Sequence, residues 1–342
     1  MAKQAGLFDW QFRLDRLSEA GDPLVRLDQT VDWDMFRPLL ETIRPPRQKG
    51  KAGRPPYDAV LMFKISILRS FYNLSLDQTE FQILDRVSFM RFLGLSLGDR
   101  IPDANTIWIF ENAMAESELE RDLFALFDEH LREAGFEAKK GQIVDASFVQ
   151  VPRQRNSHDE NDRIKNGETP ELWAPNKRRQ KDTDARWTKK NGNSYFGYKN
   201  HVAVDAKHKF IRNYETTDAS VHDSQVFEEL LDDRNSNKDV HADSAYISEE
   251  SEATLRELGY RPKLIRKGSR NRPLTEKEKQ ANRKKSKMRV RVEHVFGAQH
   301  QTSFGRTIVR TIGGVRTACQ IGLRNLTYNL QRFTHLTTKK AT

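Results

Sequence analysis

The sequence predicts an α/β protein in which an all-α N-terminal domain precedes a mixed five-stranded sheet with flanking helices. Between Tyr57 and about Gly135 the apolar residues recur at spacings of three and four, as on the buried side of a helix. After Gly141 the period becomes that of β-strands, and these strands soon alternate with helical segments. A length of 342 residues is enough for two such domains.

The composition restricts the class of protein. Lys and Arg number 58 against 48 Asp and Glu, so the chain carries a formal net charge of +10, which favours a polyanionic partner such as nucleic acid. Cys319 is the single cysteine, which excludes an intramolecular disulfide framework and a multi-cysteine zinc site. No apolar run approaches the length of a membrane span, and the N-terminus lacks a signal-peptide pattern. We therefore expect a cytoplasmic protein.

Residues 1–56 are expected to form an N-terminal arm and a basic linker. They mix aromatic with acidic residues and end in RPPRQKGKAGRPP, where Pro, Gly and basic residues dominate. An arm of this kind could touch DNA phosphates or a minor groove, and a plain linker has the same composition.

Residues 57–137 are predicted to form four or five helices. The first carries Val60, Phe63, Ile67 and Phe71 along one face. Capping-type residues mark the later starts and a glycine marks the last stop: Ser75, Pro102, Ser117 and Gly135. A helical bundle serves either DNA-end binding or dimerisation, and periodicity does not decide between them.

The elements after residue 138 follow the order strand, hairpin, helix, strand, helix, strand, helix. They extend to residue 335, with 336–342 as a tail. The first helix is expected in SVHDSQVFEELLDDR, with Ser220 and Asp223 as a start that resembles a capping box. A charged segment at 152–194 is too polar for a core and too long for an ordinary loop. The order of elements is that of an RNase H-like fold.

Three acidic residues occur in three different sequence contexts. Asp145 lies in the first strand, Asp243 ends the apolar strand DVHADSAYI, and Glu293 lies in a basic helical stretch. In an RNase H-like sheet the first strand and the strand after the first helix are neighbours, which brings the first two carboxylates together. Carboxylate oxygens suit Mg²⁺ and Mn²⁺, and paired metal ions promote in-line displacement at phosphorus. For Asp145 a structural pair with a nearby Arg is the alternative.

The stretch from Arg261 to Glu293 carries 14 Lys and Arg against 3 acids. Such a cluster is typical of phosphate-backbone binding, and a solvated linker is the alternative. Helical phase places Arg289 and His300 within about 40° of Glu293, although an ordinary i, i+4 surface pair would give the same spacing. The residues of this stretch predicted to contact DNA are Lys284, Lys285, Lys287, Arg289, Arg291 and His300.

Several blocks of the chain resemble one known family. QIVDAS, SYFGYKNHVAVD, TDASVHDSQ, ADSAY and VEHVFG occur in this order, after the helical stretch RPPYDAVLMFKISILRSFYNLSLDQTEFQILDRVSFMRFLGLSL. Together they resemble the DDE transposases of bacterial insertion sequences, in particular Insertion Sequence family five. The resemblance extends from about Arg54 to about Leu330. Each block is modestly specific alone, and all of them in order are highly specific.

The resemblance implies that Asp145, Asp243 and Glu293 form the catalytic and metal-binding triad, with Mg²⁺ as cofactor and Mn²⁺ as a substitute. It implies a transposase that binds the terminal inverted repeats of its insertion sequence, cleaves DNA and transfers the strand into target DNA. No covalent protein–DNA intermediate is expected. The partners would be double-stranded DNA and a second copy in a homodimer, at the bacterial nucleoid.

The surroundings of the triad depart from the family pattern. The wider family often carries Tyr, Arg, Glu and Lys on its final helix, whereas Ser286 stands here in place of the Tyr and His300 in place of the Lys. Lys199 and His201 in GYKNHV are predicted phosphate contacts beside the site, with strand-surface solubility as the alternative. Trp173 and Trp187 in the charged segment could stack on a displaced base, although a hydrophobic anchor is the favoured interpretation.

Two other functions remain open. One is a catalytically inactive, transposase-derived DNA-binding protein, and the intact triad argues against it. The other is an RNase H-like nuclease or junction resolvase, which does not need the N-terminal helical module.

Overall fold

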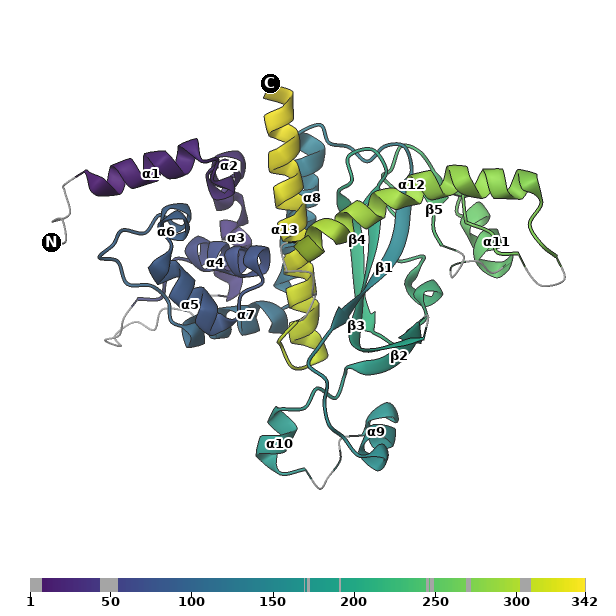
Figure 1. The fold of residues 1–342 in the computed structure, drawn as a ribbon, viewed down its shortest axis with the longest axis horizontal. Helices are drawn as coiled ribbons and strands as arrows, with labels where there is room; N and C mark the ends of the chain where they lie inside the picture. Colours follow the sequence, from purple (N-terminus) through teal and green to yellow (C-terminus); the bar gives the residue numbers. More distant parts are fainter. Residues whose placement is uncertain are drawn as a thin grey trace. The chain divides into compact units, whose positions relative to one another are not determined.

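The computed structural model describes residues 8–43, 55–168, 170, 173–190, 192–243, 246, 249–268, 272–301 and 309–341 (Figure 1). The chain divides into two compact units. Unit 1 comprises Met1–Leu123 with Asn329–Thr342, and unit 2 comprises Phe124–Tyr328. The division falls within helix α8 (Leu119–Glu133) and within helix α13 (Gly314–Ala341).

The described part of unit 1 is helical. Its elements are α1 (Asp9–Glu19), α2 (Pro23–Thr30), η1 (Trp33–Phe36), α3 (Arg37–Leu40), η2 (Glu41–Ile43), α4 (Ala59–Tyr72), α5 (Leu76–Asp85), α6 (Val87–Leu93) and α7 (Ala104–Glu116). Ser75 and Gln78 form a complete capping box at α5, as the sequence predicts. Ser117, predicted as another helix start, instead ends α7, and its hydroxyl donates to the Ala113 carbonyl. Buried aromatic rings hold the helices together, and the Trp33 and Phe92 centroids lie 5.4 Å apart, edge to face.

The first part of the chain differs from the arm predicted for residues 1–56. Residues 9–43 are helical, and Leu24, Leu27, Phe36 and Leu40 are at most 2% exposed. The reason is an apolar pattern that the charges disguise, since Leu24 and Leu27 lie one helical turn apart directly after the capping Asp22. Most of the basic linker, residues 44–54, lies outside the described residues.

Unit 2 contains a six-stranded mixed sheet. Its strands are β1 (Gln142–Gln150), β2 (Arg186–Lys190), β3 (Asn193–Asp205), β4 (Ile211–Asp218), β5 (Asp239–His241) and β6 (Arg261–Pro262). The order is β2–β3–β1–β5–β6, and β4 also pairs with β3. Because β2 pairs with residues 193–197 and β4 with residues 198–204, these two strands follow each other along one edge of β3. Without β2 the order is β4–β3–β1–β5–β6, so the RNase H-like fold class is confirmed, with one strand more than predicted.

The two faces of this sheet have different coverings. Val144 and Ala203 pack in a core with Phe227, Tyr246 and Leu255, that is, with the segment after η3 (Asp223–Val226) and with α11 (Glu249–Glu257). The other face is covered by α12 (Glu276–Gln301) and the part of α13 in unit 2 (Figure 1). A buried amide network joins that face to both helices, because Asn325 bonds to Asn200 on β3 and to Gln299 on α12.

The charged segment at 152–194 is ordered in three short elements, α9 (His158–Lys165), α10 (Pro175–Arg179) and β2. Trp173 is 6% exposed, and its indole Nε1 donates to Glu160 Oε1 at 2.6 Å. Trp187 on β2 is 44% exposed and lies against Phe196. The first tryptophan therefore anchors the segment, and the second faces solvent.

Two further elements differ from expectation. The predicted helix at Ser220 is reduced to the 3₁₀ turn η3, because Ser220 bonds back to Asp218 instead of capping a helix. The predicted tail 336–342 continues α13 as far as Ala341. Among the described helices no single one is long and apolar enough to cross a membrane. The two helices α4 and α5, which are bent relative to each other, match a membrane span only in their joint length and composition.

Candidate active site

Asp145 occupies the middle of β1 with its side chain on the face covered by α12. The side chain is 14% exposed. Its Oδ2 accepts a hydrogen bond from Arg289 Nη1 at 2.7 Å, and its Oδ1 accepts one from the Ala146 amide at 2.9 Å. The strand therefore directs a largely desolvated carboxylate toward the helix.

Glu293 lies one helical turn after Arg289 on α12. Arg289 Nη2 is 3.6 Å from Glu293 Oε1, so the predicted i, i+4 relation is present. The Glu293 side chain is 56% exposed, in contrast to that of Asp145. One guanidinium thus bridges a buried carboxylate on a strand and an exposed carboxylate on a helix.

Asp243 follows β5, which lies beside β1 and parallel to it. Its main-chain oxygen accepts a hydrogen bond from the Tyr246 amide. The negative charges of Glu293 and Asp243 both raise the pKa of Asp145, so the three acids share one electrostatic environment. Among the described residues no group of three His, Cys, Asp or Glu is arranged closely enough to hold a metal ion. The cation next to Asp145 here is Arg289.

Burial raises the pKa of Asp145 from 3.8 to about 6. The opposing effect of Arg289 is smaller than the desolvation of the carboxylate. Asp145, Asp243 and Glu293 carry more negative charge than the single guanidinium of Arg289 neutralises. Oxygen ligands suit a hard divalent cation. The oxygen donors of Asp145, Asp243 and Glu293 are thus of the chemical kind that suits a hard divalent cation, although the described residues are not arranged closely enough here to hold one.

Lys199 and His201 lie on the opposite face of the sheet, which corrects their predicted place beside the site. In the register of β1 and β3, Asp145 is opposite Val202, and His201 is opposite Ala146. Side chains alternate along a strand, so His201 and Lys199 point away from the Asp145 face.

Both residues are also engaged within the protein. Lys199 is 8% exposed, and its Nζ lies 2.8 Å from Asp223 Oδ1. His201 is fully buried, with Nε2 2.9 Å from Thr217 Oγ1, and burial lowers its pKa to about 4. The side chains of Lys199 and His201 therefore lie inside the protein in this structure, neither on its surface nor at a place where they would contact a DNA phosphate. The sequence does not reveal Asp223 as the partner of Lys199.

The predicted DNA-binding residues of α12 fall into two groups. Lys284 and Lys287 are exposed. Lys285 donates to the Leu264 carbonyl at 2.8 Å, and Arg291 donates to the Ala206 carbonyl, so both tie the helix to the rest of unit 2. The side chain of His300 lies outside the described residues.

Two further basic residues on α12 are exposed but are not among those predicted to contact DNA. Lys277 and Arg283 are exposed and precede Lys284 in the chain. The local excess of positive charge points to this stretch of the chain. It does not distinguish the basic residues that face solvent from those that do not.

Comparison with known proteins gives three similarities. A family model described as "Transposase DDE domain" matches residues 137–330, more than half of the chain. A second, described as "Transposase domain (DUF772)", matches residues 12–113. Among solved structures, the cryo-EM structure of the piggyBac transposase synaptic complex with hairpin DNA is similar, with a TM-score of 0.48 and 12% sequence identity. That alignment covers 94% of this chain and 76% of the other.

Proposed function

Since the chain belongs to the DDE transposases, we propose that it binds the terminal inverted repeats of an insertion sequence, cuts DNA there and joins the freed 3′ end to target DNA. The observation that carries the proposal is the convergence of Asp145 on β1 and Glu293 on α12 on one guanidinium, with Asp243 acting on the same carboxylate. Groups with a strongly shifted pKa occur preferentially at functional sites.

In this proposal Asp145, Asp243 and Glu293 hold Mg²⁺, with Mn²⁺ as a substitute. Bound divalent ions lower the pKa of water and stabilise charge on a leaving oxygen. Asp145 supplies the fixed ligand, because its strand and the Ala146 amide set its position. Glu293 supplies the accessible ligand, because more than half of its side chain is exposed.

The exposed lysines of α12 contact the DNA backbone in the same proposal. Lys284 and Lys287 lie on the helix that carries Glu293, and their side chains are exposed. Lysine–phosphate contacts give salt-sensitive affinity and set the position of the duplex, but they do not read sequence. Two copies of the chain are needed to hold two ends, so we propose that the DNA complex contains a homodimer.

The test uses Asp243→Asn and Glu293→Gln proteins with a duplex that carries the element's end. Both variants should lose Mg²⁺-dependent strand cleavage and retain DNA binding. Glu228→Gln removes an exposed acid from the same unit and serves as the matched control, with cleavage unchanged. Full cleavage by either triad variant would contradict the assignment. A wild-type protein that binds the end but never cuts it would favour the inactive DNA-binding protein instead.

A further inference from the structure

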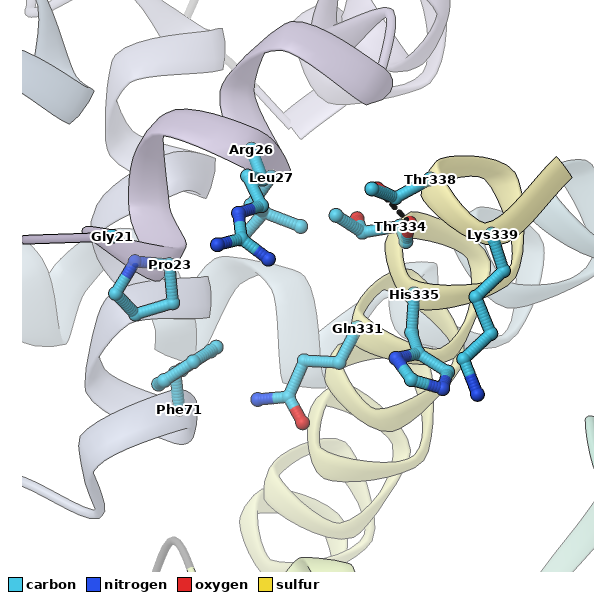
Figure 2. A pocket seen from close by; sticks show the side chains of 10 residues that line it. All are labelled: Gly21, Pro23, Arg26, Leu27, Phe71, Gln331, Thr334, His335, Thr338 and Lys339. Atoms are coloured by element: carbon cyan, nitrogen blue, oxygen red, sulfur yellow. Dashed lines mark hydrogen bonds between the residues drawn. The ribbon is translucent and has the colours of Figure 1, made fainter. Parts of the chain in front are cut away.

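Unit 1 contains a pocket between α2, the end of α4 and the C-terminal part of α13 (Figure 2). Its volume is about 450 Å³, within the range of small-molecule sites. All of its lining residues belong to unit 1: Gly21, Pro23, Arg26, Leu27, Phe71, Gln331, Thr334, His335, Thr338 and Lys339.

The lining of the pocket carries basic side chains and no acidic ones. Arg26 comes from α2, and His335 and Lys339 come from α13. Within the described part of the chain none of the three lies in an ion pair. Burial and the charges of Lys339 and Arg332 lower the pKa of His335, as expected where cations gather without a counter-charge. The pocket therefore has the electrostatics of an anion site.

The walls of the pocket add an apolar surface and an amide. Leu27 is 2% exposed and contributes to the wall formed by α2. In Figure 2 the ring of Phe71 and the side-chain amide of Gln331 lie near each other, and Arg26 extends toward the same space. A ligand that carries both an anionic group and a flat ring would satisfy all of these groups at once. Nucleotides have this combination.

We propose that this pocket binds one nucleotide, with its phosphate at Arg26 and its base against Phe71 and Gln331. The inference rests on the proposed function, because a transposase meets nucleotides chiefly as DNA. Stacking of bases on aromatic rings is a main source of affinity in single-stranded DNA sites. The same chemistry would accept an unpaired nucleotide of a DNA substrate or a free nucleoside monophosphate.

The test measures binding of the full-length protein by fluorescence polarisation in EDTA, so that cleavage does not enter. Two labelled duplexes of equal length are compared, one fully paired and one with a single unpaired nucleotide. The variants are Arg26→Ala and Gln331→Glu, the second of which places a negative charge in the pocket at nearly constant volume. Arg13→Ala removes one exposed cation from α1 in the same unit and is the matched control.

The wild-type protein should prefer the duplex with the unpaired nucleotide. Arg26→Ala and Gln331→Glu should weaken binding of that duplex by roughly tenfold, equivalent to about 1.4 kcal/mol. Binding of the paired duplex should weaken less, and Arg13→Ala should affect both duplexes equally and by less than about twofold. Unchanged thermal melting would show that the variants are folded.

A third arm separates the two sources of the nucleotide. If dAMP displaces the unpaired duplex from the wild-type protein but not from Arg26→Ala, the pocket also accepts a free nucleotide. If dAMP has no effect and the variants still lose affinity, the nucleotide is part of DNA. Equal losses for pocket variants and Arg13→Ala would overturn the pocket assignment. Full cleavage by the triad variants would refute the proposed function without altering this result.

Discussion

Replacement of Asp145 by asparagine should stabilise the metal-free protein while it abolishes activity. The carboxylate is largely buried, and its pKa of about 6 lies above the ordinary value of 3.8. One pKa unit corresponds to about 1.4 kcal/mol, so the ionised side chain costs the folded state about 3 kcal/mol at neutral pH. The raised pKa already includes the favourable pair with Arg289, and this figure is therefore net of that pair. The neutral amide would avoid the cost in nearly the same volume.

The pH dependence of this effect has a definite sign. Between about pH 4 and pH 6 the folded state binds more protons at Asp145 than the unfolded state does. Folding stability therefore falls as the pH rises through that window, and the full cost applies above it. The advantage of Asp145→Asn should be about 3 kcal/mol at pH 8 and should shrink below about 1 kcal/mol at pH 4. The charged groups that set the window are Arg289, Glu293 and Asp243.

Calorimetry with a chelator present tests this prediction. For a unit of this size 1 kcal/mol shifts Tm by roughly 2–4 °C, so a gain of about 3 kcal/mol should make Asp145→Asn melt roughly 6–12 °C higher at pH 8. Glu293→Gln is the matched control, because its exposed side chain should change stability by less than about 0.5 kcal/mol. A destabilised Asp145→Asn protein, or an advantage that is equal at pH 4 and pH 8, would refute the reasoning.

Three further predictions concern other contacts. Arg212→Met should lower the free energy of unfolding by roughly 3–5 kcal/mol in urea denaturation, since the guanidinium is 1% exposed and lies 2.6 Å from Asp128; a loss below about 1 kcal/mol would contradict a buried pair. Arg289→Gln should tighten Mn²⁺ binding several-fold in an EPR titration without DNA, and unchanged affinity would exclude competition between guanidinium and metal. Trp173→Ala should speed limited proteolysis of the segment from 152 to 190, whereas Trp187→Ala should leave the cleavage rate unchanged.

The sequence predicted those relations that depend on local geometry. The i, i+4 spacing on a helix was enough to pair Arg289 with Glu293. The order of strands and helices was enough to make β1 and β5 neighbours. The first relation follows from the constant repeat of the α-helix, and the second follows from the topology of the RNase H-like fold.

The wrong placement of Lys199 and His201 depended on strand register, which the sequence does not specify. A shift of one residue between β1 and β3 would move both side chains to the face of Asp145. The register comes from packing of the whole sheet against two sets of helices, a property of many residues together. The N-terminal helices were missed for a related reason, because Leu24 and Leu27 form a core only with residues far away in the sequence.

Helix α12 also fixes the separation between a basic side chain near its start and the acid Glu293 near its end. It spans 26 residues without a break, with Lys277 near its start and Glu293 near its end. Sixteen residues at 1.5 Å per residue separate these two positions by about 24 Å, which equals about seven base-pair steps at 3.4 Å. At 100° per residue the same two positions also lie about 160° apart around the helix axis, so Lys277 and Glu293 point to nearly opposite sides of the helix. A DNA phosphate bound at Lys277 would therefore lie away from the phosphate at the proposed metal site, both along the helix and around it.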